Sequence, residues 1–175
     1  MRFNYNTNAY KNYLIASSTN RCTAILDTGA SMTVIDLYTL SRLVNKKAEE
    51  LKIQAESLIS RGIINVTNVR TASGHENRVI PVKVHNFILS DEQFDIFYMH
   101  LNIDKKEDRE GYSNIILIGL DIIRAGKIQG DADHIEITGF DYEKYKNNFI
   151  EIYGNTFNIF QISDESISNI GIERE

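Results

Sequence analysis

Residues 23–35 read TAILDTGASMTVI, an Asp-Thr-Gly turn between two apolar segments. Both segments are rich in residues that favour strands, so the turn is predicted to join two β-strands. The first strand delivers the Asp27 carboxylate to the turn, and Gly29 allows the chain to bend there. A carboxylate held in this way suits acid–base chemistry on a water molecule. The chain carries one copy of this motif.

Length and composition predict a globular chain with one main domain. The 175 residues are enough to bury a core, and 42% hydrophobic with 25% charged residues is ordinary for a globular protein. The net charge of -5 gives no broad basic surface, so a nucleic-acid partner is not expected. The single cysteine, Cys22, excludes an internal disulfide and is predicted to be a small buried or half-buried strand residue.

The sequence gives no membrane or export signal. No apolar run approaches the roughly 20 residues that span a bilayer, and residues 1–6, MRFNYN, lack the apolar core of a secretory signal. We therefore expect a cytoplasmic protein without a membrane partner. The four histidines lie in different segments without the spacing of metal ligands, so neither a metal nor another cofactor is expected.

The first half of the chain is predicted to contain two hairpins and a helical segment. Tyr10–Ala16 and Arg21–Leu26 form the first hairpin. Asp36 can cap a helix whose apolar residues recur every three or four positions up to Gly62, as one long helix or as two joined near Asn45. The second hairpin pairs residues 63–69 with residues 78–89, which leaves Pro81 at a sheet edge or a strand start.

The second half is predicted to be mainly β, with one short helix. A strand at 94–103 and a charged loop at 104–113 precede an apolar strand, Ile115–Ile118, which stops at Gly119. The elements expected after it are a short helix at 120–125, a strand at 135–138, a hairpin of 149–153 with 156–162 around Gly154-Asn155, and a polar tail from Ser163.

Three motifs in this order resemble those of retropepsin-like aspartic proteases. They are the Asp-Thr-Gly segment at 24–35, the glycine-containing turn at 71–74 and the segment Ile116-Leu117-Ile118-Gly119-Leu120-Asp121. The resemblance covers residues 21–128 and implies a mostly β, retropepsin-like closed barrel or sandwich. We assign residues 1–140 to this domain, with a helical insertion at 36–62. Residues 141–175, with the hairpin at 149–162 and the polar tail, form an extension that small retroviral enzymes lack.

The resemblance implies that Asp27 is catalytic and that two chains each contribute one copy. Two carboxylates about 3 Å apart share one proton and titrate as a unit. Thr28 resembles the residue that hydrogen-bonds across the dimer axis, and Gly29 the residue that allows close approach to substrate. Ala30 stands where pepsin-like enzymes often have Ser or Thr, which implies a mildly acidic to neutral optimum. The implied partners are a second copy of the chain and a peptide substrate.

The resemblance implies roles for two further segments. Thr71, Ala72, Ser73 and Gly74 resemble the flap, a hairpin that closes over bound peptide. Ile118 and Gly119 resemble the segment that passes close behind the active-site loop.

The chain also departs from the retroviral pattern. Ser31 and Met32 replace acidic residues, and Leu120 replaces an arginine. The ionic network of the retroviral dimer is therefore missing, and a homodimer must be held differently. Residues 149–162 either supply the added interface or close the chain's own core.

Two other functions remain open from the sequence. The first is a binding or dimerisation module of the same fold without useful proteolysis. The second is a hydrolase or phosphatase that uses Asp27 as a nucleophile, although the second nearby Asp of the common phosphatase motif is absent. The intact trio of Asp27, Thr28 and Gly29 favours the protease, because a binding module has no need of it.

Overall fold

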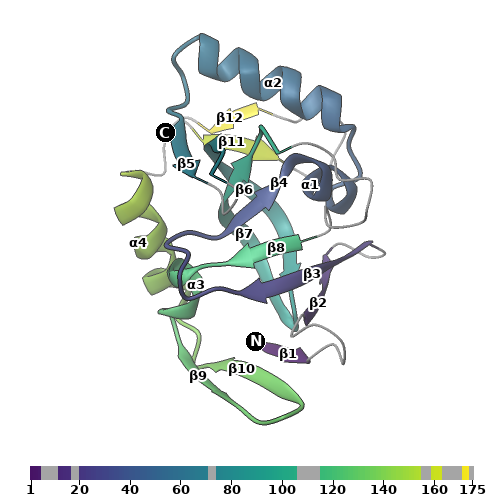
Figure 1. The fold of residues 1–175 in the computed structure, drawn as a ribbon, viewed down its shortest axis with the longest axis vertical. Coiled ribbons are helices and arrows are strands. Elements are labelled where there is room, and N and C mark those ends of the chain that lie inside the picture. Colours follow the sequence, from purple (N-terminus) through teal and green to yellow (C-terminus); the bar gives the residue numbers. More distant parts are fainter. Residues whose placement is uncertain are drawn as a thin grey trace.

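Two β-sheets and four helices make up the fold in the computed structural model, which describes residues 1–4, 12–16, 20–70, 74–105, 115–154, 159–162 and 171–173 (Figure 1). The larger sheet is formed by β2 (Asn12–Ala16), β3 (Asn20–Leu26), β4 (Val34–Asp36), β5 (Thr67–Arg70), β6 (Glu76–Leu89), β7 (Glu92–Asn102), β8 (Ile115–Ile118), β11 (Ile159–Ile162) and β12 (Gly171–Glu173). The smaller sheet is formed by β1 (Arg2–Asn4), β9 (Lys127–Gly130) and β10 (His134–Thr138). The helices are α1 (Leu37–Leu43), α2 (Ala48–Ser60), α3 (Leu120–Ile123) and α4 (Tyr142–Tyr153).

The strands on either side of the Asp-Thr-Gly turn are not neighbours in the sheet, because β8 lies between them. β8 pairs in parallel with β3 and antiparallel with β4. The chain between β3 and β4 must therefore cross the end of β8. Since Leu26 pairs with Ile118, the turn at Asp27 meets Gly119 at that end of the sheet.

The predicted helical insertion consists of two helices rather than one. The Asp36 carboxylate caps α1 by accepting hydrogen bonds from Thr39 N (2.9 Å) and Thr39 Oγ1 (2.7 Å). Residues 44–47 then separate the helices, with Asn45 in a left-handed conformation at φ 54°. None of the helices in the described ranges is both long and apolar enough to cross a membrane.

Both predicted hairpins are present. β2 pairs antiparallel with β3, and β5 pairs antiparallel with β6. Cys22 on β3 is fully buried, as expected, and burial raises the pKa of its thiol to about 12. Of the predicted charged loop, only Asp104 and Lys105 lie within the described residues.

Pro81 is not at a strand start but in the middle of β6. There it pairs with His100 of β7, whose own N–H donates to Thr33 O on the other side. On the far side of β6, pairing with β5 ends at Val79 and pairing with β11 begins at Val82. At Pro81, β6 therefore has neither β5 nor β11 beside it, so the missing N–H of proline costs no hydrogen bond between strands.

The predicted hairpin at 149–162 is wrong, because residues 142–153 form helix α4. Asp141 caps its start, and Gly154, at φ 102°, ends it as a left-handed C-cap. Tyr145 and Phe149 are both fully buried while Asn147 between them is exposed, which is helical spacing rather than strand alternation. Residues 155–158 lie outside the described residues.

The C-terminal strands join the main sheet instead of forming a separate hairpin. β11 pairs in parallel with β6, and β12 pairs antiparallel with β11. The prediction of a polar tail from Ser163 is therefore wrong for Gly171–Glu173. The domain boundary at residue 140 stays a prediction. Phe149 and Phe160, which lie after it, belong to the same hydrophobic core as Phe97, which lies before it.

Candidate active site

The Asp27 side chain is oriented by its own turn. Gly29 N donates to Asp27 Oδ1 at 2.9 Å, and Ala30 N donates to Asp27 O at 3.1 Å. Asp27 N donates to Ile118 O at 2.9 Å, which continues the pairing of β3 with β8. Asp27 is half-buried, while Thr28 and Gly29 are exposed. The carboxylate is thus fixed at the surface with one oxygen engaged by the backbone.

Gly119 passes directly behind the turn, at the position predicted from the sequence. A Cβ atom on Gly119 would lie 2.4 Å from both the carbonyl carbon and the oxygen of Met32. Leu120 N donates to Ala30 O at 2.9 Å, so the backbones of the two segments are joined there. Only glycine allows this approach, because these neighbours are backbone atoms that cannot move aside.

A buried pair, Thr33 and Asp121, holds the far end of the segment from Asp27 to Thr33, called the Asp27 loop below. Thr33 Oγ1 donates to Asp121 Oδ1 at 2.6 Å, and Thr33 N donates to Asp121 Oδ2 at 3.1 Å. Burial raises the pKa of the Asp121 carboxyl, and the hydrogen bonds from Thr33 oppose that rise. Asp121 was not among the site residues predicted from the sequence. The available signal was an acidic residue two positions after the glycine that ends an apolar strand, followed by two isoleucines.

A cavity of about 990 Å³ separates the Asp27 loop from the β5–β6 hairpin. Asp27 and Gly29 line one side, and Val69 and Asn77 of the hairpin line the other. Val34 and Leu117, paired across β4 and β8, give the cavity an apolar wall beside the carboxylate. The cavity therefore offers a carboxylate, an apolar surface and strand backbone within one space.

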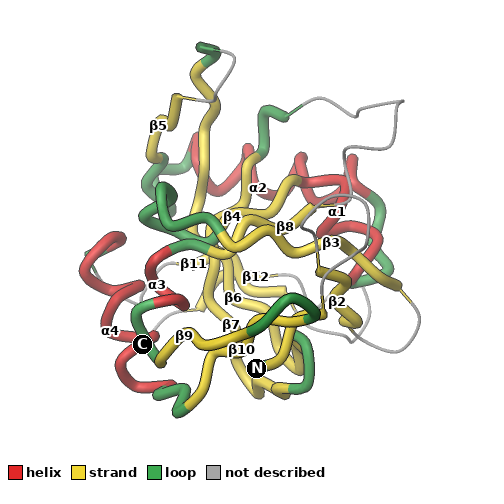
Figure 2. The backbone as a smooth tube through the Cα atoms, turned by 60° about the horizontal axis from the view of Figure 1, so that its bottom comes forward, coloured by secondary structure: helices red, strands yellow, loops and turns green. Residues whose placement is uncertain are grey.

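The β5–β6 hairpin stands where the flap was predicted, and Figure 2 shows it projecting from the rest of the fold. Arg70 pairs with Glu76 next to the turn of the hairpin, and Gly74 beyond them is exposed with φ 85°. Thr71, Ala72 and Ser73, the other predicted flap residues, lie outside the described residues. Gly74 therefore lies in the connection between β5 and β6, and its role as a flap residue stays a prediction.

Arg78 links the base of this hairpin to helix α2 and to the end of β7. Its Nη2 donates to Glu56 Oε1 at 2.6 Å and to Asp104 Oδ1 at 2.8 Å. Its backbone N donates to Asp104 Oδ2 at 2.8 Å. Hydrogen bonds from Arg78 lower the pKa of both carboxyls. This network, which the sequence analysis missed, ties α2 to the wall of the cavity.

Replacing Arg78 with Met is expected to destabilise the fold in a pH-dependent way. Because both carboxyl pKa values are lowered in the folded state, their contribution is present above the ordinary carboxyl pKa and is lost as the pH falls through the folded values. All three side chains are partly exposed, so we expect a loss of only about 1 kcal/mol at neutral pH.

Urea unfolding of both proteins over a range of pH measures this difference. Arg70→Met, at an exposed arginine of the same hairpin, controls for the loss of a positive charge. A difference between wild type and Arg78→Met that did not shrink on acidification would contradict the assigned role.

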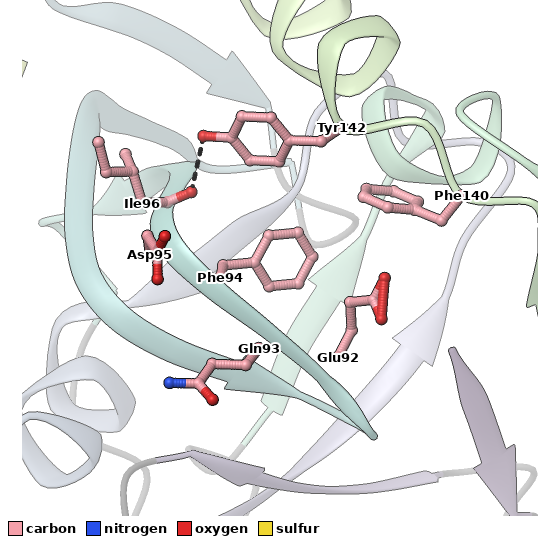
Figure 3. A pocket seen from close by; sticks show the side chains of 7 residues that line it. All are labelled: Glu92, Gln93, Phe94, Asp95, Ile96, Phe140 and Tyr142. Atoms are coloured by element: carbon pink, nitrogen blue, oxygen red, sulfur yellow. Dashed lines mark hydrogen bonds between the residues drawn. The ribbon is translucent and has the colours of Figure 1, made fainter.

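A second cavity, of about 430 Å³, lies between the start of β7 and the segment that leads into α4 (Figure 3). Phe94 packs edge-to-face against Phe140, with ring centroids 5.6 Å apart, and Tyr142 Oη donates to Ile96 O at 2.9 Å. Its aromatic lining packs against itself and anchors α4 on β7. Asp27 does not line this cavity, so it is separate from the candidate active site.

His75 lines the cavity together with Asp27. No group of three or more His, Cys, Asp or Glu side chains within the described ranges is arranged to hold a metal ion. His100 lies close to the loop through its backbone bond to Thr33, but its ring is buried, and burial lowers its pKa to about 4. Asp27 is therefore the group around which the candidate site is built.

The solved structures that match this chain include two proteins of the predicted kind. A retropepsin-like aspartic protease from Rickettsia conorii aligns with 77% of this chain and 95% of its own, at 18% identity and a TM-score of 0.46. The retroviral protease-like domain of Ddi1 from Leishmania major aligns with 73% of this chain and 88% of its own, at 14% identity and a TM-score of 0.37. The fold of this chain is mostly β, and both proteins to which it is similar are of the retropepsin or retroviral-protease type.

The comparisons do not identify a function for this chain. Searches with protein-family models and against curated proteins gave no match. The two TM-scores are modest and the identities are low, and neither match assigns a function to this chain.

Proposed function

We propose that this chain is an aspartic endopeptidase, in which two copies of Asp27, one from each subunit of a homodimer, activate a water molecule to hydrolyse a peptide bond. The observation that carries the proposal is the half-buried Asp27 carboxylate, held by its own turn and facing a large cavity beneath a hairpin. One such loop per chain supplies one carboxylate, and the chemistry requires two.

The reaction follows from bringing two carboxylates together. Close approach prevents both from ionising, so they hold one proton between them. The ionised member takes a proton from water, whose oxygen attacks the carbonyl carbon, while the protonated member donates its proton to the carbonyl oxygen. The carboxyl that took a proton from water then donates it to the amide nitrogen, while the other carboxylate takes a proton from a hydroxyl of the tetrahedral intermediate. The C–N bond breaks, the amine and the new carboxylic acid are released, and the pair again holds one proton.

The cavity suits an extended peptide. Strand backbone at the hairpin can pair with the peptide backbone, and side-chain pockets can read alternate residues. Val34 and Leu117 place an apolar surface next to Asp27. The hairpin on the opposite side would exclude bulk water once a peptide is bound.

The homodimer in this proposal needs contacts other than the retroviral ionic network. Ser31 is exposed, Met32 is half-buried, and Leu120 packs against the chain's own core. Phe149 and Ile159–Ile162 are not available as an added interface of the predicted kind, because Phe149, Ile159, Phe160 and Ile162 are fully buried within the chain. The partner-facing surface must therefore come from other residues.

We expect the active species to have twice the 20.0 kDa mass of the chain. Analytical ultracentrifugation over a concentration series, run beside cleavage assays on a peptide library, measures both properties. Specific activity should rise with concentration as dimer forms. A strict monomer at high concentration would rule out the two-chain site, and a dimer that cleaves nothing would favour the binding module.

A further inference from the structure

We propose that Asp121 is a positioning residue, which holds the Asp27 loop in place through Thr33 and thereby sets the rate of cleavage rather than peptide binding. This inference rests on the proposed function, because it assigns the loop's position a role in catalysis. Asp121 is 1% exposed and is not among the residues that line the cavity. Its effect on the site is therefore exerted through the residues to which it is hydrogen-bonded.

The geometry makes Thr33 the link between three segments. Asp121 Oδ1 accepts from Thr33 Oγ1 (2.6 Å) and from Ile122 N (2.9 Å), while Oδ2 accepts from Thr33 N (3.1 Å). A threonine hydroxyl has one proton, which it gives to Asp121. Its oxygen is then free to accept from Gly119 N, which lies 3.1 Å away. One hydroxyl thus joins the loop, the segment behind it and the start of α3.

These bonds matter for Asp27 because they fix the opposite end of the same loop. The loop begins where Asp27 N donates to Ile118 O and ends at Thr33, whose carbonyl accepts from His100 N; both distances are 2.9 Å. With both ends tied, the carboxylate has little freedom to move. Since a displacement of about 1 Å can cost roughly 100-fold in rate, the Thr33 end is expected to affect catalysis.

Burying a carboxylate costs free energy, so an apolar side chain would hold a loop in place more cheaply if stability were the only purpose. Burying a charge without an opposite charge is unfavourable, and among the described residues no salt bridge reaches Asp121. The Asp121 carboxylate accepts three hydrogen bonds, two from backbone N–H groups and one from the Thr33 hydroxyl. Costly polar groups of this kind are typical of positions where geometry serves function.

The chain contains a matched control for this arrangement. Thr39 donates to Asp36 through both its hydroxyl and its backbone N–H, at 2.7 and 2.9 Å, and both residues are buried. This second Thr–Asp pair caps α1 and does not line the cavity. A substitution there removes the same type of hydrogen bond without acting on the Asp27 loop.

The test compares Thr33→Val, Thr33→Ser, Asp121→Asn and Thr39→Val in steady-state kinetics and thermal unfolding. We expect Thr33→Val to lower kcat by about 100-fold with KM within about twofold, and Thr33→Ser to restore most of kcat. Asp121→Asn, which keeps the shape but loses one acceptor, should lower kcat by about tenfold. Thr39→Val should lose stability and keep kcat.

Specific results would overturn the inference. Raised KM with unchanged kcat in Thr33→Val, equal losses in Thr33→Val and Thr33→Ser, or an equal kcat loss in Thr39→Val would each show that Asp121 and Thr33 do not position the loop. If Thr33→Val does not fold, Asp121→Asn is judged against Thr39→Val by the same criteria.

Failure of the proposed function is distinguishable from failure of this inference. If the wild-type chain cleaves no peptide, the protease proposal fails, and loop positioning is then judged by hydrogen exchange at the amides of Asp27 and Ala30. Faster exchange in Thr33→Val and Asp121→Asn, but not in Thr33→Ser or Thr39→Val, would support the positioning role. Unchanged exchange would overturn it.

Discussion

Asp27→Asn is expected to abolish peptide cleavage while leaving the fold unchanged. An asparagine keeps an oxygen that can accept the hydrogen bond now made by Gly29 N, and the half-buried side chain requires no charge for packing. It cannot take a proton from water, and two amides cannot share one. We expect kcat to fall by at least about 10³-fold, a typical loss for an acid–base group.

The measurement is peptide turnover beside the urea unfolding midpoint of each protein. Asp95→Asn, the same chemical change at an exposed carboxylate lining the second cavity, is the control and should retain activity. Mixing Asp27→Asn with wild type should also inhibit, because mixed dimers hold one carboxylate. Unchanged turnover in Asp27→Asn would refute the catalytic assignment.

Elements that depend on local sequence could be predicted well. The Asp-Thr-Gly turn, the capping of α1 by Asp36, and both hairpins follow from residues close together in the chain. Gly119 was also placed correctly behind the turn, although 90 residues separate it from Gly29. The resemblance of ordered motifs supplied that contact, since periodicity alone cannot pair distant strands.

The C-terminal part shows where local patterns mislead. Gly154-Asn155 is a strong hairpin signal, yet a glycine in the left-handed region also ends helices, and at Gly154 it ends α4. The choice was settled by packing, because Tyr145 and Phe149 are buried while Asn147 between them is exposed, which a strand would not produce. The parallel pairing of β11 with β6 likewise depends on tertiary contacts that no short window contains.

The polar residues that the sequence analysis missed belong to long-range contacts. Arg78 contacts Glu56 and Asp104, which are 22 and 26 positions away in sequence. Thr33 and Asp121 are 88 positions apart. Neither pair has a spacing that marks it, so a charged residue within an apolar segment was the only available hint. Both networks adjoin the cavity, because Asp104 lines it and Thr33 lies between the lining residues Met32 and Val34.

Gly119→Ala is expected to be the most damaging single-methyl addition near the site. Gly119 has φ −95°, which alanine adopts readily, so any loss comes from crowding rather than from backbone strain. The added Cβ would lie 2.4 Å from Met32 backbone atoms and 2.9 Å from Ala30 O. Relief requires the Asp27 loop to move away from β8. We expect a loss of about 3 kcal/mol in the free energy of unfolding and about 100-fold in kcat.

Gly62→Ala separates crowding from the general effect of replacing a glycine. Gly62 has φ 69° but nothing within 4 Å of an added Cβ, so alanine there should cost only about 1–2 kcal/mol of backbone strain and no activity. Urea unfolding and steady-state kinetics on both variants give the comparison. If Gly119→Ala were no worse than Gly62→Ala in stability and kept full kcat, the close passage behind the loop would not be what fixes Asp27. A larger loss of kcat than of folded fraction would instead show that contact with Gly119 controls the carboxylate's position.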